Sequence, residues 1–131
     1  MKIHVLLGAA LTCASIGMTA RAADTDTGAR LYLNHCAACH GFEGEGGGPV
    51  AATMRVTVPN LRTLAQRSNG VFPADAVTAY VDGREITAAH GDRQMPIWGD
   101  VFRGPEQGTA ERTVRRRIAA VVDFVATLQY R

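Results

Sequence analysis

Apolar residues recur at helical spacing in several stretches of the chain, and no stretch alternates as a half-buried strand does. The strongest of these stretches begins near residue 109 and closes the chain. Its apolar positions follow i, i+3, i+4, i+7 spacing with an aromatic residue beside them: Ile118, Val121, Val122, Val125 and Leu128, with Phe124. The pattern predicts a long amphipathic C-terminal helix.

Two shorter helices are predicted in the first half of the chain. One covers about residues 27–38, where Gly28, Leu31 and Tyr32 lie at helical spacing. A glycine inside this helix costs stability but permits a close helix–helix contact. The other opens at Asn60, a residue type suited to an N-cap, and ends at the Asn-Gly pair 69–70.

A further helix is predicted over about residues 73–82, with Val77, Tyr80 and Val81 facing inward and Gly83 at its end. The glycine-rich stretch 41–49 and residues 84–105 show no period and are expected to be loops. The fold class is therefore all-α, with three to five helices and long loops. Loops of this length are unusual in a compact domain, so the core is expected to contain more than side chains.

The chain of 131 residues is short enough to form one domain after a leader. Lys2 and His4 precede an apolar run of about 13 residues, which ends near a small-x-small site at 20–22. The run is shorter than the ~20 residues of a membrane span, so a retained anchor is the weaker alternative. We expect a cleaved signal peptide at residues 1–22, a domain at 23–131 and no membrane span after cleavage.

Removal of this leader changes the charge and the cysteine count. Of 14 Lys and Arg residues, the leader contains Lys2 and Arg21, which leaves 12 cations against 12 acidic residues. A balanced charge argues against nucleic acid as a partner. Cys13 is lost with the leader, so only Cys36 and Cys39 remain.

The sequence Cys36-Ala37-Ala38-Cys39-His40 contains the most specific motif of the chain. Two thiols separated by two residues and followed by histidine can attach a c-type haem through two thioethers, with the imidazole as proximal iron ligand. A zinc site would need a second pair of ligands, a thioredoxin-like pair would need a βαβ pattern, and a disulfide would close a very short loop. Haem attachment after export predicts a bacterial periplasmic location.

With these features together, the chain resembles the class I monohaem cytochromes c of bacteria over about residues 26–130. Gly28 and Tyr32 match the glycine and the aromatic that such proteins carry before the first haem cysteine, and Val121 and Phe124 match their partners on the C-terminal helix. The resemblance implies that the backbone carbonyl of Pro49 accepts a hydrogen bond from the proximal histidine.

The resemblance also implies a methionine as the distal iron ligand. Met95 lies in a predicted loop before Pro96, and its soft thioether suits reduced iron and raises the potential. Met54, the other methionine of the processed chain, and His90 are the alternatives. The expected cofactor is one haem c, attached through Cys36 and Cys39 and ligated by His40 and Met95.

Other polar and aromatic residues have less specific expectations. Trp98 either hydrogen-bonds a haem propionate or is a core aromatic. Arg93 and Arg84 are candidates for balancing the propionate charge. His35, beside the first haem cysteine, is expected to be solvated. The processed chain contains no lysine, so a partner that docks through a ring of lysines is not expected.

The resemblance implies a periplasmic one-electron carrier rather than an enzyme, because an iron with both axial positions filled leaves no site for a substrate. Its partners would be a protein donor and a protein acceptor of electrons. The alternative is a haem c subunit of a larger respiratory or dehydrogenase complex. A haem enzyme or gas sensor with an open distal position is the third hypothesis.

Overall fold

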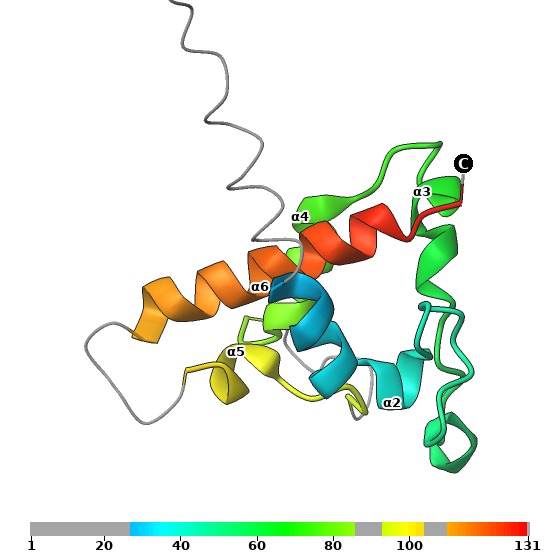
Figure 1. Ribbon diagram of the computed structural model, residues 1–131, viewed down its shortest axis with the longest axis horizontal. Coiled ribbons are helices and arrows are strands. Elements are labelled where there is room, and N and C mark those ends of the chain that lie inside the picture. Colours follow the sequence, from blue (N-terminus) through cyan, green and yellow to red (C-terminus); the bar gives the residue numbers. More distant parts are fainter. Residues whose placement is uncertain (1–26, 86–92, 104–109, 131) are drawn as a thin grey trace, which may run out of the picture.

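The computed structural model describes residues 27–85, 93–103 and 110–130. Within these ranges all regular structure is helical, which confirms the predicted class. An N-terminal helix covers residues 27–35 and is followed by the labelled elements of Figure 1. These are α2 (Ala37–His40), η1 (Ala51–Thr53), η2 (Leu61–Thr63), α3 (Leu64–Arg67), α4 (Ala74–Asp82), α5 (Trp98–Val101) and α6 (Ala110–Thr127).

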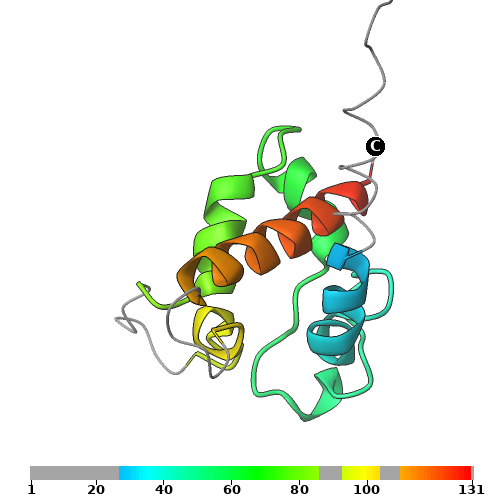
Figure 2. The same cartoon turned by 60° about the vertical axis from the view of Figure 1, so that its left-hand side comes forward.

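Helix α6 runs between α4 on one side and the N-terminal helix on the other (Figure 2). Phe124 and Leu128 of its predicted apolar face are half-buried. The other predicted positions, Ile118, Val121, Val122 and Val125, are buried as expected, and Val114 is buried with them. These residues divide between two hydrophobic clusters: one with Tyr32 and Cys36, and one with Val81 and Phe102.

The N-terminal helix crosses α6 at Gly28, as the sequence predicts. A Cβ on Gly28 would overlap the carbonyl oxygen of Ala120 and lie 3.0 Å from the Cβ of Phe124. One turn further on, the fully buried ring of Tyr32 packs against Phe124 with ring centroids 5.2 Å apart. The Tyr32 hydroxyl donates a 2.7 Å hydrogen bond to the carbonyl of Gly41, so this contact also fixes the chain beyond α2.

Helix α4 ends at Gly83, as predicted. Gly83 has a φ of 71° and donates its N–H to the carbonyl of Ala79, the arrangement that glycine makes possible at a helix C-terminus. Val81 is buried and Val77 half-buried, but the prediction that Tyr80 faces the core is wrong. Its side chain is 53% exposed and forms part of a cavity wall instead.

The segment from Asn60 to residue 70 is confirmed only in part as a helix. The Asn60 side chain caps it by accepting the N–H of Arg62 at 2.9 Å, but the first turn is a 3-10 turn and α3 covers only four residues. The end of the chain holds this short segment. Gln129 accepts the N–H of Ala65 and donates to the carbonyl of Leu61, both at 2.9 Å.

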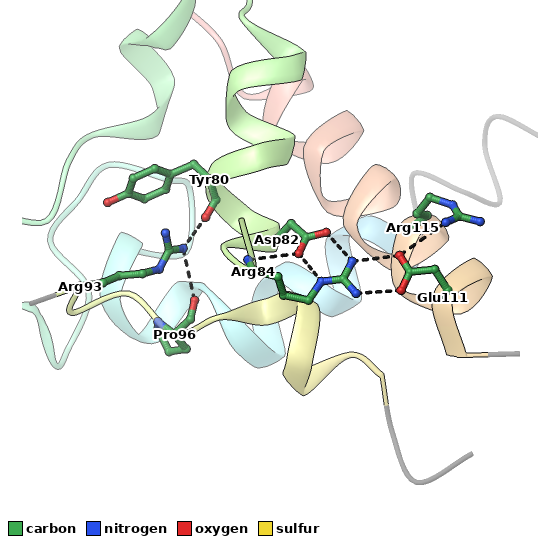
Figure 3. A network of polar contacts seen from close by, with 7 residues as sticks. All are labelled: Tyr80, Asp82, Arg84, Arg93, Pro96, Glu111 and Arg115. Atoms are coloured by element: carbon green, nitrogen blue, oxygen red, sulfur yellow. Dashed lines mark hydrogen bonds and ion pairs between the residues drawn. The ribbon is translucent and has the colours of Figure 1, made fainter. Parts of the chain in front are cut away.

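A network of charged residues joins the end of α4 to the start of α6 (Figure 3). Arg84 contacts both carboxylate oxygens of Asp82, at 2.5 and 2.7 Å, and both of Glu111, at 2.7 and 3.0 Å. The hydrogen bond from Arg84 holds the pKa of the Asp82 carboxyl below its usual value. Gly99 of α5 packs on this pair, since a Cβ there would lie 2.8 Å from Cδ of Arg84.

Residues 98–101 form α5, although residues 84–105 were expected to be loop, so this prediction is wrong there. A four-residue helix is too short to show a period in the sequence. The predicted leader, residues 1–22, lies outside the described residues. Within the described ranges, none of the helices combines the length and the apolar composition that crossing a bilayer requires.

Substitution of Gly28 by alanine should test the crossing of the N-terminal helix with α6. We expect Gly28→Ala to lower the free energy of unfolding by about 1–3 kcal/mol, because the added methyl group forces the two backbones apart. Gly47→Ala is the matched control, since a Cβ at Gly47 has no neighbour within 4 Å. Denaturant unfolding of both holoproteins measures the effect, and equal stability of the two variants would contradict the close crossing.

Candidate haem site

Cys36, Cys39 and His40 are brought together by one turn of backbone at the end of the N-terminal helix. The amide of Cys39 donates to the carbonyl of Cys36 at 3.1 Å, and the amide of His40 donates to the same oxygen at 2.9 Å. The two cysteines are not joined in a disulfide. All three side chains line one cavity, as the motif predicts.

A second cavity shares part of its lining with this one, and the two have volumes of about 370 and 310 Å³. These volumes lie in the range of small-molecule and cofactor sites. The residues common to both walls are Cys36, His40, Pro59, Tyr80 and Met95. The second cavity is otherwise mainly apolar and reaches α6 at Val121 and Val125.

Burial determines the protonation of two of these groups. It lowers the pKa of His40, although the hydrogen bond to Pro59 opposes the shift, so the imidazole is favoured in its neutral form. Burial, reinforced by Cys39, raises the pKa of Cys36 to about 12, so that side chain is a thiol at neutral pH. A neutral imidazole is the form that binds a metal.

The carbonyl that contacts the His40 ring is that of Pro59 and not that of Pro49, so the prediction for Pro49 is wrong. Nδ1 of His40 lies 3.3 Å from the carbonyl oxygen of Pro59. A carbonyl only accepts hydrogen bonds, so Nδ1 carries the proton and Nε2 keeps its lone pair for a metal. Pro49 lies exposed in a turn and lines neither cavity.

The course of the loop explains why the later proline reaches His40. The amide of Gly46 donates to the carbonyl of His40 at 2.7 Å, and the chain then leaves the site through η1. It returns beside Gly46, where an added Cβ would lie 2.9 Å from the carbonyl oxygen of Val58 and 3.1 Å from the carbonyl carbon of Pro59. Gly46 has a φ of 93°, so both its backbone conformation and its surroundings favour glycine.

Met95 lies where the two cavities meet, whereas Met54 lines only the first of them. Met95 also packs against the cluster of Val81 and Phe102. His90, the other alternative for the distal ligand, lies outside the described residues. The structure therefore places Met95 and His40 among the residues that line both cavities, and Met95 stays a prediction for the ligand.

Trp98 and His35 form an aromatic group with Phe102 at the edge of the first cavity. The His35 ring centroid lies 5.3 Å from both the Trp98 and the Phe102 centroid, and the latter two are 5.6 Å apart. The prediction that His35 is solvated is wrong, because its position one residue before the motif turns it toward α5. Trp98 lines the first cavity, and its indole is half-buried.

The two candidate arginines have different positions. Arg84 is engaged by Asp82 and Glu111 and lines neither cavity, so the structure does not bring it to the site. Arg93 lines the first cavity and contacts backbone carbonyls. Tyr80 and Pro59 were not predicted as site residues. The available sequence signal for Pro59 was its position directly before the Asn60 cap. Tyr80 had no signal beyond its position in a predicted helix.

The donor set fits a covalently attached haem. Two thiols, a neutral imidazole and a thioether lie on the walls of adjoining, largely apolar cavities, which is the chemistry that such attachment and ligation need. Among the described residues, no group of three or more His, Cys, Asp and Glu side chains is placed to hold a metal ion by itself. The zinc alternative therefore lacks its further ligands within that part of the chain.

Comparison with known proteins finds a family match. A family model described as cytochrome c oxidase, cbb3-type, subunit III, matches residues 23–125, well over half of the chain. No curated protein and no solved structure matches significantly.

Substitutions at Gly46 and Pro49 should distinguish the two candidate supports of His40. Gly46→Ala pushes on Val58 and Pro59 and strains a positive φ, so we expect a loss of about 1–3 kcal/mol in unfolding free energy. The His40 ring N–H should also exchange faster, as measured by NMR of the holoprotein. Pro49→Ala should change neither quantity. Faster exchange in Pro49→Ala, with Gly46→Ala unchanged, would reverse the assignment.

Proposed function

The chain belongs to the family of cbb3-type cytochrome c oxidase subunit III, and from that premise we propose that it is an exported one-electron carrier whose haem is held by Cys36 and Cys39 and ligated by His40 and Met95. Membership confirms the predicted resemblance to c-type cytochromes, their electron-transfer function and the covalent haem c. The individual ligands and the cellular location remain proposals.

One observation supports the proposed ligand pair most strongly. His40 and Met95 each line both of the adjoining cavities, whereas Met54 lines only the first. An imidazole and a thioether together give a higher potential than two imidazoles. Pro59 supports this role of His40, because a hydrogen bond to Nδ1 fixes the tautomer and increases the basicity of the other nitrogen.

The bound haem c supplies an iron that alternates between the ferric and ferrous states. The residues of the chain hold it, limit its contact with water and determine its axial ligands. Tyr32, Val121 and Val125 form an apolar wall, which disfavours added charge in the pocket. With both axial positions filled by side chains, we propose that the protein is not itself an enzyme.

The proposed location is the bacterial periplasm, reached through the signal peptide at residues 1–22. The family match begins at residue 23, directly after the proposed cleavage site, which supports a domain of residues 23–131. We propose protein partners as donor and acceptor of the electron, with no membrane span after cleavage.

The description of the matching family favours one alternative, a haem c subunit that stays bound to an oxidase or another respiratory complex. A stable complex requires a larger and more apolar interface than a shuttle, whose contacts are small and short-lived. A haem enzyme or gas sensor with an open distal position is the less favoured third candidate.

Met95→Ala should test the distal ligand. We expect loss of the ferric absorption band of methionine ligation and a fall in reduction potential of a tenth of a volt or more, within the ~0.8 V range that axial ligands produce. Redox titration with visible spectroscopy measures both. Met54→Ala is the matched control and should keep the band. Wild-type protein should bind carbon monoxide poorly; ready binding would instead favour the open-site candidate.

The native size of the protein should separate the shuttle from the bound subunit. A free shuttle elutes from gel filtration of an untreated periplasmic extract near the mass of the processed chain. Co-elution of all haem with a much larger oxidoreductase would establish the alternative. The membrane fraction, solubilised in mild detergent and run in the same way, shows whether a complex was left behind.

A further inference from the structure

Arg93 joins the segment that carries Met95 to the end of α4 (Figure 3). Its Nε donates to the carbonyl of Met95 at 2.8 Å, and Nη2 donates to the carbonyls of Tyr80 and of Pro96, the latter at 3.4 Å. One side chain therefore contacts the backbone on either side of the Met95–Pro96 peptide bond and the backbone of a helix.

The helix side of this contact has a clear physical basis. The last carbonyls of a helix have no partner within it, and the C-terminus carries a partial negative charge, so a guanidinium is favoured there. The Gly83 amide binds the carbonyl of Ala79, and Arg93 binds the next one, that of Tyr80. Arg93 therefore completes the C-terminal cap that Gly83 begins.

Two further features hold the guanidinium in place. Its central carbon lies 4.5 Å from the centroid of the Tyr80 ring, a cation–π distance. Gly83 leaves the necessary room, because a Cβ there would lie 3.0 Å from both Cζ and Nη2 of Arg93. The Tyr80 ring, the C-terminus of α4 and the space left by Gly83 together determine where the Arg93 guanidinium lies.

We propose that Arg93 is a positioning residue that holds Met95 at the haem position by fastening its backbone to α4, an inference that rests on Met95 being the distal ligand. The other role considered for Arg93, balancing a propionate, would require its donors to face a carboxylate. Nε and Nη2 are instead engaged by backbone carbonyls.

The planar guanidinium is suited to this role in a way that lysine is not. It offers donors in a fixed fork and stacks on the Tyr80 ring, whereas an ammonium is a point charge on a flexible stem. Arg93→Lys keeps the positive charge at the end of α4 but loses the fork. Arg93→Gln loses the charge as well.

The test measures how tightly added imidazole displaces the distal ligand from the ferric holoprotein. We expect Arg93→Gln to bind imidazole about tenfold more tightly than wild type, equal to ~1.4 kcal/mol, and Arg93→Lys to show a smaller increase. Met95→Ala should bind imidazole most tightly. Adding Arg93→Gln to Met95→Ala should then have no further effect, because Arg93 acts through Met95.

Arg112→Gln is the matched control, since Arg112 lies exposed on α6 and the substitution removes the same charge. Unchanged imidazole affinity in Arg93→Gln, or an equal increase in the wild-type and Met95→Ala backgrounds, would overturn the positioning role. If Met95→Ala itself leaves the affinity unchanged, the proposed ligand is wrong. If Arg93→Gln gives no folded holoprotein, Arg93→Lys and Tyr80→Leu decide, and wild-type affinity in both overturns the proposal.

Discussion

The contact on which the rest of the structure depends is the close crossing of the N-terminal helix and α6. Gly28 lets the backbone of one helix meet the carbonyl of Ala120 in the other. Because Cys36 follows the same helix two turns later, this crossing determines where the thiols and His40 lie relative to the apolar face of α6. A larger separation would move the motif away from Val121 and Val125, which pack in one cluster with Cys36 and line the second cavity.

The sequence predicted the parts of the fold that a local pattern encodes. The period of α6, the glycine in the crossing and the Gly83 cap were all correct, because each depends on nearby residues. Elements held by distant partners were predicted less well. The short α3 is fastened by Gln129, more than sixty residues away, and α5 is one turn packed on the Asp82–Arg84 pair.

The same distinction applies to the site. The motif at Cys36, Cys39 and His40 defines its own geometry, so the cavity that these side chains share could be predicted. The support for His40 depends on how a loop of twelve residues between Gly46 and Pro59 returns, and proximity in sequence favoured Pro49 wrongly. His35 and Arg84 were likewise determined by partners on other elements: Trp98 and Phe102 for His35, and Glu111 for Arg84.

Helix α4 connects these features, because it contacts the core, the second cavity and Arg93. Val77 and Val81 pack in the core and also line the second cavity, together with Ala76 and Tyr80. The C-terminal end of the helix receives Arg93. Arg84, one residue beyond the Gly83 cap, joins the same end of the helix to α6 through Glu111. Arg84 thus holds the chain directly after α4, and Arg93 holds it again just before Met95.

These two arginines have different roles, because Arg84 contacts carboxylates and Arg93 contacts backbone carbonyls. A carboxylate neutralises the guanidinium charge and joins elements, whereas carbonyls leave the charge in place beside the cavity. In the ligation proposed above, that remaining positive charge and the thioether of Met95 would both favour reduced iron, so the proposed positioning contact would also act in the direction of a higher potential.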